Sequence, residues 1–183
     1  MTIDLKILSQ LQTLFKKLSS GSHLNRLEEP EIWVDLETHL QQYETLFSEL
    51  GFALIFDLRG FAYFKNDSAS SHTSKITRRL ALFFLLLFEY QADNGLHLVQ
   101  FQQWRVDNVL IDKLCQNYHA IFEAEDISSA ANLKEILDSA TRIGFAVFEN
   151  GAFRLLPAVH RYLDLFEELA QANRSDEIAE ESQ

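Results

Sequence analysis

The stretch LGFALIFDLRGFAYF at residues 50–64 has a second copy at residues 143–156, which read IGFAVFENGAFRLL. In each copy a helical pattern of apolar residues runs up to the glycine, a residue that readily ends a helix in the left-handed conformation. Two short apolar segments then flank a polar turn, which is the pattern of a β-hairpin. The second turn contains Asn150-Gly151, a strong hairpin signal. The chain therefore repeats one local plan, in which a helix ends at a glycine and leads into a hairpin.

The rest of the sequence places further helices before each copy. Residues 30–50 predict either one long helix or two helices with a turn near His39, and residues 96–101 predict a short strand. Helices that lead into a hairpin are typical of a winged-helix domain. We therefore predict a mainly α fold with small β-hairpins (α+β), built as tandem winged-helix domains. Apolar residues at three- and four-residue steps predict the other helices at about 4–18, 75–92, 103–122 and 130–143, and from Pro157 onward.

Composition places two boundaries in the chain. Residues 66–74 (NDSASSHTS) contain no large apolar residue, which is typical of a linker, and Thr73 or Ser74 can cap the helix that follows. Residues 173–183 are mostly polar and acidic, a composition that favours disorder. The predicted parts are an N-terminal winged-helix domain at 1–67, a C-terminal winged-helix domain at 73–172 and a disordered acidic tail at 173–183.

The chain is acidic, with 16 Lys and Arg residues against 27 Asp and Glu residues and a formal net charge of −11. Such a chain repels the phosphate backbone at long range, which disfavours DNA binding by the chain alone. Its one cysteine cannot form an internal disulfide, which suits a reducing compartment. Residues 1–18 lack the continuous apolar stretch of a signal peptide, and the longest apolar run is too short to span a bilayer. We expect a cytoplasmic protein.

No motif in the sequence carries recognisable catalytic chemistry. The six histidines are scattered, and a phosphate-binding glycine loop, a nucleophile elbow and a zinc-protease motif are all missing. Cys115 and His119 lie one helical turn apart, which could make a reactive thiol or half of a metal site. The simpler interpretation is a structural cysteine beside a partly exposed histidine. We predict no catalytic, cofactor-binding or metal-binding residues and no enzyme activity.

Residues 80–88 (LALFFLLLF) form a helical segment that is apolar on every face. Such a helix has to be covered on all sides, and one small domain covers only part of it. We therefore predict that the segment, together with aromatic residues of the first hairpin, contacts another subunit. The alternative for the hairpin rings, including Phe64 and Phe153, is that they face the core of their own domain. The predicted dimer or partner interface contains Leu80, Phe83, Phe84, Leu87, Phe88, Phe61 and Tyr63.

The first hairpin and the linker reverse the acidic trend of the chain. Five cations and one carboxylate, that of Asp67, give the stretch 59–79 a local balance of +4. Winged-helix proteins use such cations on DNA phosphates, so we predict DNA contact here within a larger assembly; the alternative is a solvated face or pairing with carboxylates. The helices before the two hairpins are acidic or neutral, which favours protein contacts instead. The five cations are Arg59, Lys65, Lys75, Arg78 and Arg79.

Three short motifs in the chain resemble those of a known family. PEIW at 30–33, DLRGFAY at 57–63 and FRLLP at 153–157 resemble MksE, the small subunit of MukBEF-like bacterial condensins. MksE is related to MukE and to the small subunit of the Wadjet plasmid-defence systems. The resemblance covers about residues 18–170. It implies a nucleoid-associated homodimer that binds a kleisin subunit (MksF/MukF-like) and, through the kleisin, joins an SMC-type ATPase (MksB/MukB-like). The family has no catalytic residues to carry over.

Two functions from different classes remain at this point. The first is an accessory subunit of a condensin complex that supports chromosome condensation and partition or plasmid defence. The second is a free-standing winged-helix transcriptional regulator that binds DNA as a dimer. Net charge and the neutral helix before the second hairpin favour the first, whereas Arg59, Arg78 and Arg79 leave the second open.

Overall fold

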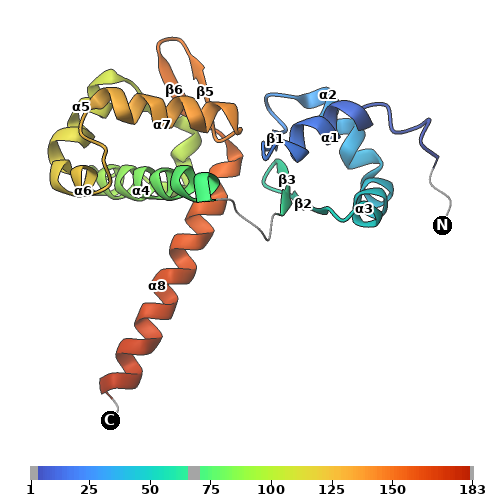
Figure 1. The fold of residues 1–183 in the computed structure, drawn as a ribbon. Coiled ribbons are helices and arrows are strands. Elements are labelled where there is room, and N and C mark those ends of the chain that lie inside the picture. Colours follow the sequence, from blue (N-terminus) through green and yellow to red (C-terminus); the bar gives the residue numbers. More distant parts are fainter. Residues whose placement is uncertain (1–3, 66–70, 182–183) are drawn as a thin grey trace.

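The computed structural model describes residues 4–65 and 71–181, which fold into two winged units (Figure 1). The N-terminal unit is residues 4–65 and the C-terminal unit is residues 71–181. In the N-terminal unit, the sheet is antiparallel with strand order β1-β3-β2. Its elements are α1 (Leu11–Ser19), β1 (Leu24–Asn25), α2 (Pro30–Thr38), α3 (Leu40–Glu49), β2 (Ala53–Asp57) and β3 (Phe61–Lys65).

The C-terminal unit repeats the strand arrangement, with three helices instead of two between its first strand and its hairpin, and a long helix follows the hairpin. Its antiparallel sheet has the order β4-β6-β5, so each unit has a central strand from the second half of its hairpin. The elements are α4 (Ser71–Asp93), the 3-10 helix η1 (Leu98–Gln103), β4 (Arg105–Val106), α5 (Asn108–Asn117), α6 (His119–Ala124), α7 (Ala130–Arg142), β5 (Ala146–Glu149), β6 (Ala152–Leu155), the 3-10 helix η2 (Pro157–Val159) and α8 (His160–Glu181). The predicted fold class and both hairpins are confirmed.

Local chemistry explains where several helices begin and end. α2 starts at Pro30, whose fixed φ suits a first helical position. Asp107 accepts a hydrogen bond from the Leu110 amide and caps α5, while Ser129 does the same for α7 through the Asn132 amide. The stretch 30–50 is two helices, because the backbone leaves helical geometry at His39, which confirms that alternative.

Other boundaries differ from the prediction. The helix predicted at 103–122 is broken at Tyr118 into α5 and α6. The strand predicted at 96–101 is wrong: η1 occupies most of it, and the pairing partner of β6 is β4 instead. Phe101 explains the change, since η1 buries this ring completely in the C-terminal core. A loose period of two over six residues does not separate a strand from a 3-10 turn that buries one aromatic ring.

The ends of three predicted elements also differ from the structure. α1 begins at Leu11 rather than near residue 4, and α4 begins at Ser71, inside the predicted linker. The rest of that linker, residues 66–70, lies outside the described residues. α8 continues to Glu181, where the sequence predicted a disordered tail from residue 173. Ala, Glu and Arg in this stretch are strong helix formers, so an acidic composition did not prevent a helix. None of the helices in residues 4–65 and 71–181 is long and apolar enough to cross a membrane.

Candidate interaction surfaces

The two units meet along a joint formed by residues 22–25, the segment around β1, and residues 142–145, the segment before β5. The His23 amide donates to the Ile143 carbonyl at 2.9 Å, which ties the backbones together. The Asn25 side chain is 2% exposed, donates to the Gly144 carbonyl at 2.9 Å and accepts from the Ala158 amide at 3.4 Å. A buried amide with both ends satisfied makes the joint specific in its geometry.

His23 occupies the centre of the joint and is 3% exposed. Its Nδ1 lies 2.7 Å from the Ile143 carbonyl and its Nε2 lies 2.7 Å from Nη1 of Arg161. These partners define a neutral imidazole that donates from Nδ1 and accepts at Nε2. Burial, and then the Arg161 charge, lower the pKa of His23 from 6.5 to about 3. The Arg161 guanidinium also stacks 3.8 Å above the ring centroid of Tyr63, which closes the joint from the outer side.

β3 faces both units at once, because successive side chains of a strand point to opposite faces. Ala62 and Phe64 belong to the N-terminal core. Phe61 is 1% exposed and belongs to the C-terminal core, with Tyr63 packed against it. The predicted partner residues Phe61 and Tyr63 thus contact the other unit of their own chain. The alternative interpretation, in which hairpin rings face their own core, holds for Phe64 and for Phe153, which is buried in the C-terminal core.

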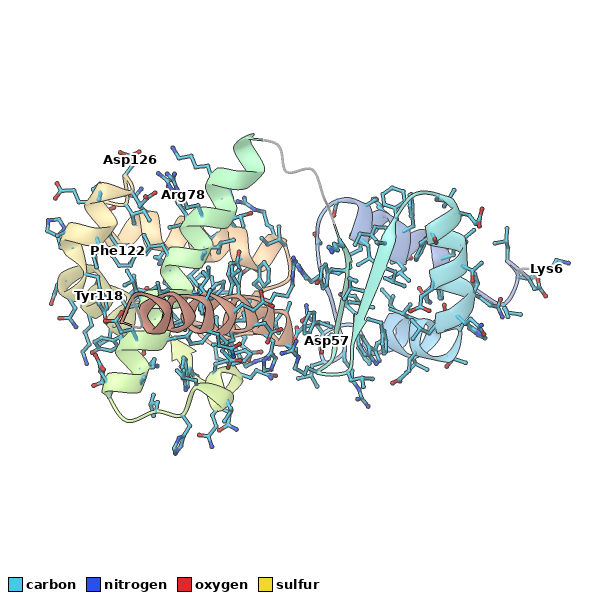
Figure 2. All side chains as sticks on the ribbon, turned by 90° about the horizontal axis from the view of Figure 1, so that it is seen from below. Lys6, Asp57, Arg78, Tyr118, Phe122 and Asp126 are labelled. Atoms are coloured by element: carbon cyan, nitrogen blue, oxygen red, sulfur yellow. The ribbon has the colours of Figure 1, made fainter. Side chains whose placement is uncertain are left out.

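Each hairpin sends one arginine to the opposite unit. Arg59, at the turn of β2–β3, donates to both carboxylate oxygens of Asp164 in α8 at 2.7 and 2.6 Å and also pairs with Asp57. Arg154 in β6 pairs with Glu28 of the N-terminal unit at 2.9 Å and with Glu149. Figure 2 shows Asp57 where the two units meet. In this conformation Arg59 is not free to contact a DNA phosphate as predicted, because the carboxylates of Asp57 and Asp164 already bind its guanidinium.

The apolar segment at residues 80–88 is covered mostly from within the chain. Its five predicted interface residues are each at most 4% exposed and lie in one core with α5, α7 and α8. This burial corrects the expectation that the helix requires a second subunit, since α8 and η1 supply cover that the sequence did not predict. One face of α4 stays open, where Leu82 is half-buried and Leu85 is 44% exposed. The buried residues are Leu80, Phe83, Phe84, Leu87 and Phe88.

The remaining cations of the predicted DNA patch are Lys65, the last residue of β3, and three residues in the first half of α4. Lys65 and Lys75 are exposed. Arg78 forms a salt bridge of 2.7 Å with Glu125, and Arg79 donates to the Glu125 and Asp126 carbonyls at 3.2 and 3.4 Å. Figure 2 places Arg78 and Asp126 at the same edge of the C-terminal unit. Arg79 therefore helps to hold the turn after α6, and the cations available to an outside ligand are fewer than the sequence predicted.

The helices before the hairpins offer little positive charge to DNA. α3 exposes Glu44 and Glu49 and contains no lysine or arginine. α7 exposes Lys134 and Arg142 together with acidic neighbours, and its charges cancel. The charges of α7 are those of Lys134, Glu135, Asp138 and Arg142. A helix that reads the major groove needs a positive or neutral hydrogen-bonding face next to phosphates, so α3 in particular does not fit this role.

A groove of about 610 Å³ lies between α4, α6 and α8, where the sequence predicted none. Its lining is mostly apolar and includes Leu82, Leu85, Ile121 and Phe166. We call it the α8 groove. α6 contributes to it only because the chain breaks at Tyr118, a break that the sequence did not predict. Cys115 of α5 is half-buried, and Nε2 of His119 in α6 lies 3.9 Å from a carboxylate oxygen of Glu123. Within the described residues, no three His, Cys, Asp or Glu side chains are placed to hold a metal ion.

Comparison with known proteins connects this architecture to one family. The sequence model of the family described as "Condensin complex protein MksE" matches residues 9–167 of the 183 residues. The match spans both winged units and the joint between them, and it ends within α8. No curated protein matches the chain.

Proposed function

Since the chain belongs to the MksE family of condensin complex proteins, we propose that it is a non-enzymatic accessory subunit of a MukBEF-like SMC complex. In this role it forms a homodimer and binds the kleisin subunit. The kleisin connects it to the SMC-type ATPase, which organises DNA for chromosome segregation or plasmid defence. The family match over residues 9–167 carries this proposal.

The surfaces of the chain support a role in binding proteins. α3 exposes only acidic and neutral residues, and the arginine at the first hairpin turn is held by Asp57 and Asp164. In the N-terminal unit, neither the helix before the hairpin nor the turn of the hairpin therefore offers a free positive charge to DNA. The α8 groove offers an apolar surface instead, which is typical of a site for another protein.

DNA contact belongs to the assembled complex in this proposal. Two exposed cations, Lys65 at the end of β3 and Lys75 near the start of α4, lie close together in sequence, whereas the whole chain carries a charge of −11. A patch of this size is outweighed by the charge of the free chain. Once the acidic faces are covered by partner subunits, the same patch adds to a larger DNA-binding surface.

Co-expression with the kleisin and the large coiled-coil ATPase from the same genome tests the proposal. We expect the tagged chain to retain the kleisin, and through it the ATPase, during affinity purification. Lys65→Glu combined with Lys75→Glu is expected to leave kleisin capture unchanged and to weaken DNA binding by the whole complex. Failure of the wild-type chain to retain the kleisin would refute the proposed function.

The free-standing regulator is the competing function, favoured by the winged-helix fold itself. It predicts a mobility shift of duplex DNA by the purified chain at about 150 mM salt, where exposed charges are screened beyond about 8 Å. Our proposal predicts no shift under these conditions. A shift that is lost in the Lys65→Glu, Lys75→Glu variant would support the regulator.

A further inference from the structure

The α8 groove is open to solvent and has apolar walls from three helices. Leu85 of α4 and Ile121 of α6 are 44% and 46% exposed, and Phe166 of α8 forms the third wall. Leu82 lies between them and is half-buried. Contiguous apolar surface of this kind is rare on a protein that acts alone and marks a binding site.

α8 carries a second apolar surface that its own chain does not cover. The helix crosses α4 and then projects away from both units (Figure 1). Beyond Phe166 every side chain up to residue 172 is exposed, and Leu169 is 54% exposed. From Phe166 to Glu181 the helix runs on for about 22 Å at 1.5 Å per residue. Because residues three apart share a helix face, Leu169 continues the surface that Phe166 begins.

We propose that the α8 groove binds the projecting part of α8 from a second copy of this chain. Phe166 lines the groove, and the exposed Leu169 lies one turn further along the same face of α8. Each copy therefore presents an apolar groove and an apolar helix face next to each other. A two-fold axis then places each α8 in the groove of the other copy, and one isologous interface covers both surfaces. This inference rests on the proposed function, which includes the homodimer, and assigns the surface that forms it.

Charge supports a second copy as the occupant. The flank of α8 beside Leu169 exposes Glu167 and Glu168. Arg78 of α4 is part of the groove lining, and its side chain is 66% exposed although it pairs with Glu125. The exchanged arrangement brings the acidic flank of α8 towards this guanidinium, which favours the pairing and its register.

Light scattering after size-exclusion chromatography tests the assignment on the full chain. We expect the wild type to be a dimer at micromolar concentration. Leu85→Glu in the groove and Leu169→Glu on α8 each place a carboxylate in the apolar interface, and we expect each to raise the dimer dissociation constant by about 100-fold or more. Leu27→Glu is the matched control, since Leu27 is 64% exposed and lies in the N-terminal unit; it should leave the dimer intact.

A cross-linking experiment identifies the contact itself. In a Cys115→Ser background, Leu85→Cys in one tagged copy and Leu169→Cys in a differently tagged copy are expected to form a mixed cross-linked dimer with a short bis-maleimide. A dimer that persists in both glutamate variants, or a cross-link that forms only between two copies of Leu169→Cys, would overturn the assignment.

Kleisin capture separates this inference from the proposed function. A wild-type chain that captures the kleisin but is a monomer leaves the proposed subunit role standing and refutes the assigned interface. Loss of kleisin capture in Leu85→Glu with the dimer retained would show that the groove holds the kleisin, which also refutes it. Circular dichroism melting of each variant confirms that the exposed substitutions leave the fold intact.

Discussion

The hairpins β2–β3 and β5–β6 both follow a helix that ends at a glycine with positive φ, and they differ in what surrounds them. At the first hairpin, Gly60 is buried beside Pro157 and Arg59 reaches Asp164, so the turn lies against the C-terminal unit. At the second hairpin, Asn150 and Gly151 are exposed, and Phe148 is 56% exposed. One local plan thus serves as part of a joint in one unit and as an outer surface in the other.

The same contrast applies to the glycines that end the two helices. An added Cβ on Gly51 would meet nothing within 4 Å, whereas one on Gly144 would lie 2.7 Å from the His23 carbonyl oxygen. Both residues have nearly the same positive φ, so the helix stop explains both glycines equally. Only the second glycine is also required by the approach of the other unit. Equivalent positions in a repeat therefore carry different constraints once the repeats pack together.

The largest expected effect comes from breaking the joint at this position. Gly51→Ala introduces only the strain of a left-handed alanine, which costs about 1 kcal/mol. Gly144→Ala introduces the same strain and also displaces the His23 backbone, so we expect a total loss of about 3 kcal/mol. Urea unfolding of the two variants measures the difference. Equal losses in both variants would mean that the joint is not formed in solution.

His23 gives the joint a dependence on pH that the outer hairpin lacks. Its folded-state pKa of about 3 lies below the ordinary value of 6.5, so between these values the unfolded chain binds the extra proton. The stability contribution is complete above pH 6.5 and falls by about 1.4 kcal/mol per pH unit as the pH drops towards 3. Protonation is unfavourable because the imidazole is buried and because its Nε2 faces the Arg161 guanidinium.

Unfolding midpoints between pH 7 and about pH 5, above the range in which Asp carboxyls titrate, measure this slope. His160, whose pKa is also lowered by burial and by Arg59, contributes with the same sign. Comparing wild type with His23→Gln therefore isolates the share of His23. Replacement of the exposed His119 by Gln is the control and should retain the full slope. A wild-type stability that stays flat over this interval would contradict the neutral, buried state of His23.

The smallest effect is expected at the arginines that hold the two hairpin turns. Arg59 bridges to the opposite unit, whereas Arg105 donates to the Asn150 carbonyl within its own unit at 3.0 Å. Because the Arg59 and Asp164 side chains are 39% and 45% exposed, solvent screens the pair, and Arg59→Ala should cost about 1 kcal/mol or less. The loss should shrink in high salt, while that of Arg105→Ala should be insensitive to salt. Thermal melts at low and high ionic strength make the comparison.

Much of this fold could be predicted from local patterns. The repeated glycine and hairpin pattern predicted both hairpins, each of which forms two strands of a sheet. The misplaced strand at 96–101 and the unbroken helix at 103–122 share one cause. In both places the deciding contact is distant in sequence, because Val106 pairs with Phe153 and the break at Tyr118 turns α6 towards α4 and α8.

The sequence indicated which types of residue form the candidate site, but not their positions on the surface. The sequence singled out apolar and basic residues around α4 as candidate contacts. A sequence, however, shows only that residues 80–88 are apolar on all faces and not which face its own chain leaves open. The structure buries Phe83 and Phe84 and exposes Leu85, so the surface that we propose for a partner begins one residue away from the predicted set.

The amino-acid sequence by itself determined the repeated winged-helix plan, the acidic balance and the family, because these depend on local periodicity, composition and short motifs. Only the tertiary structure decided that the first hairpin closes a joint, that Arg59 is occupied and that a groove opens beside α8. The first two features depend on contacts between residues more than 100 positions apart, such as His23 with Ile143 and Arg59 with Asp164. No local sequence pattern predicts such pairs, because these contacts form, and contribute to stability, only after both units have folded.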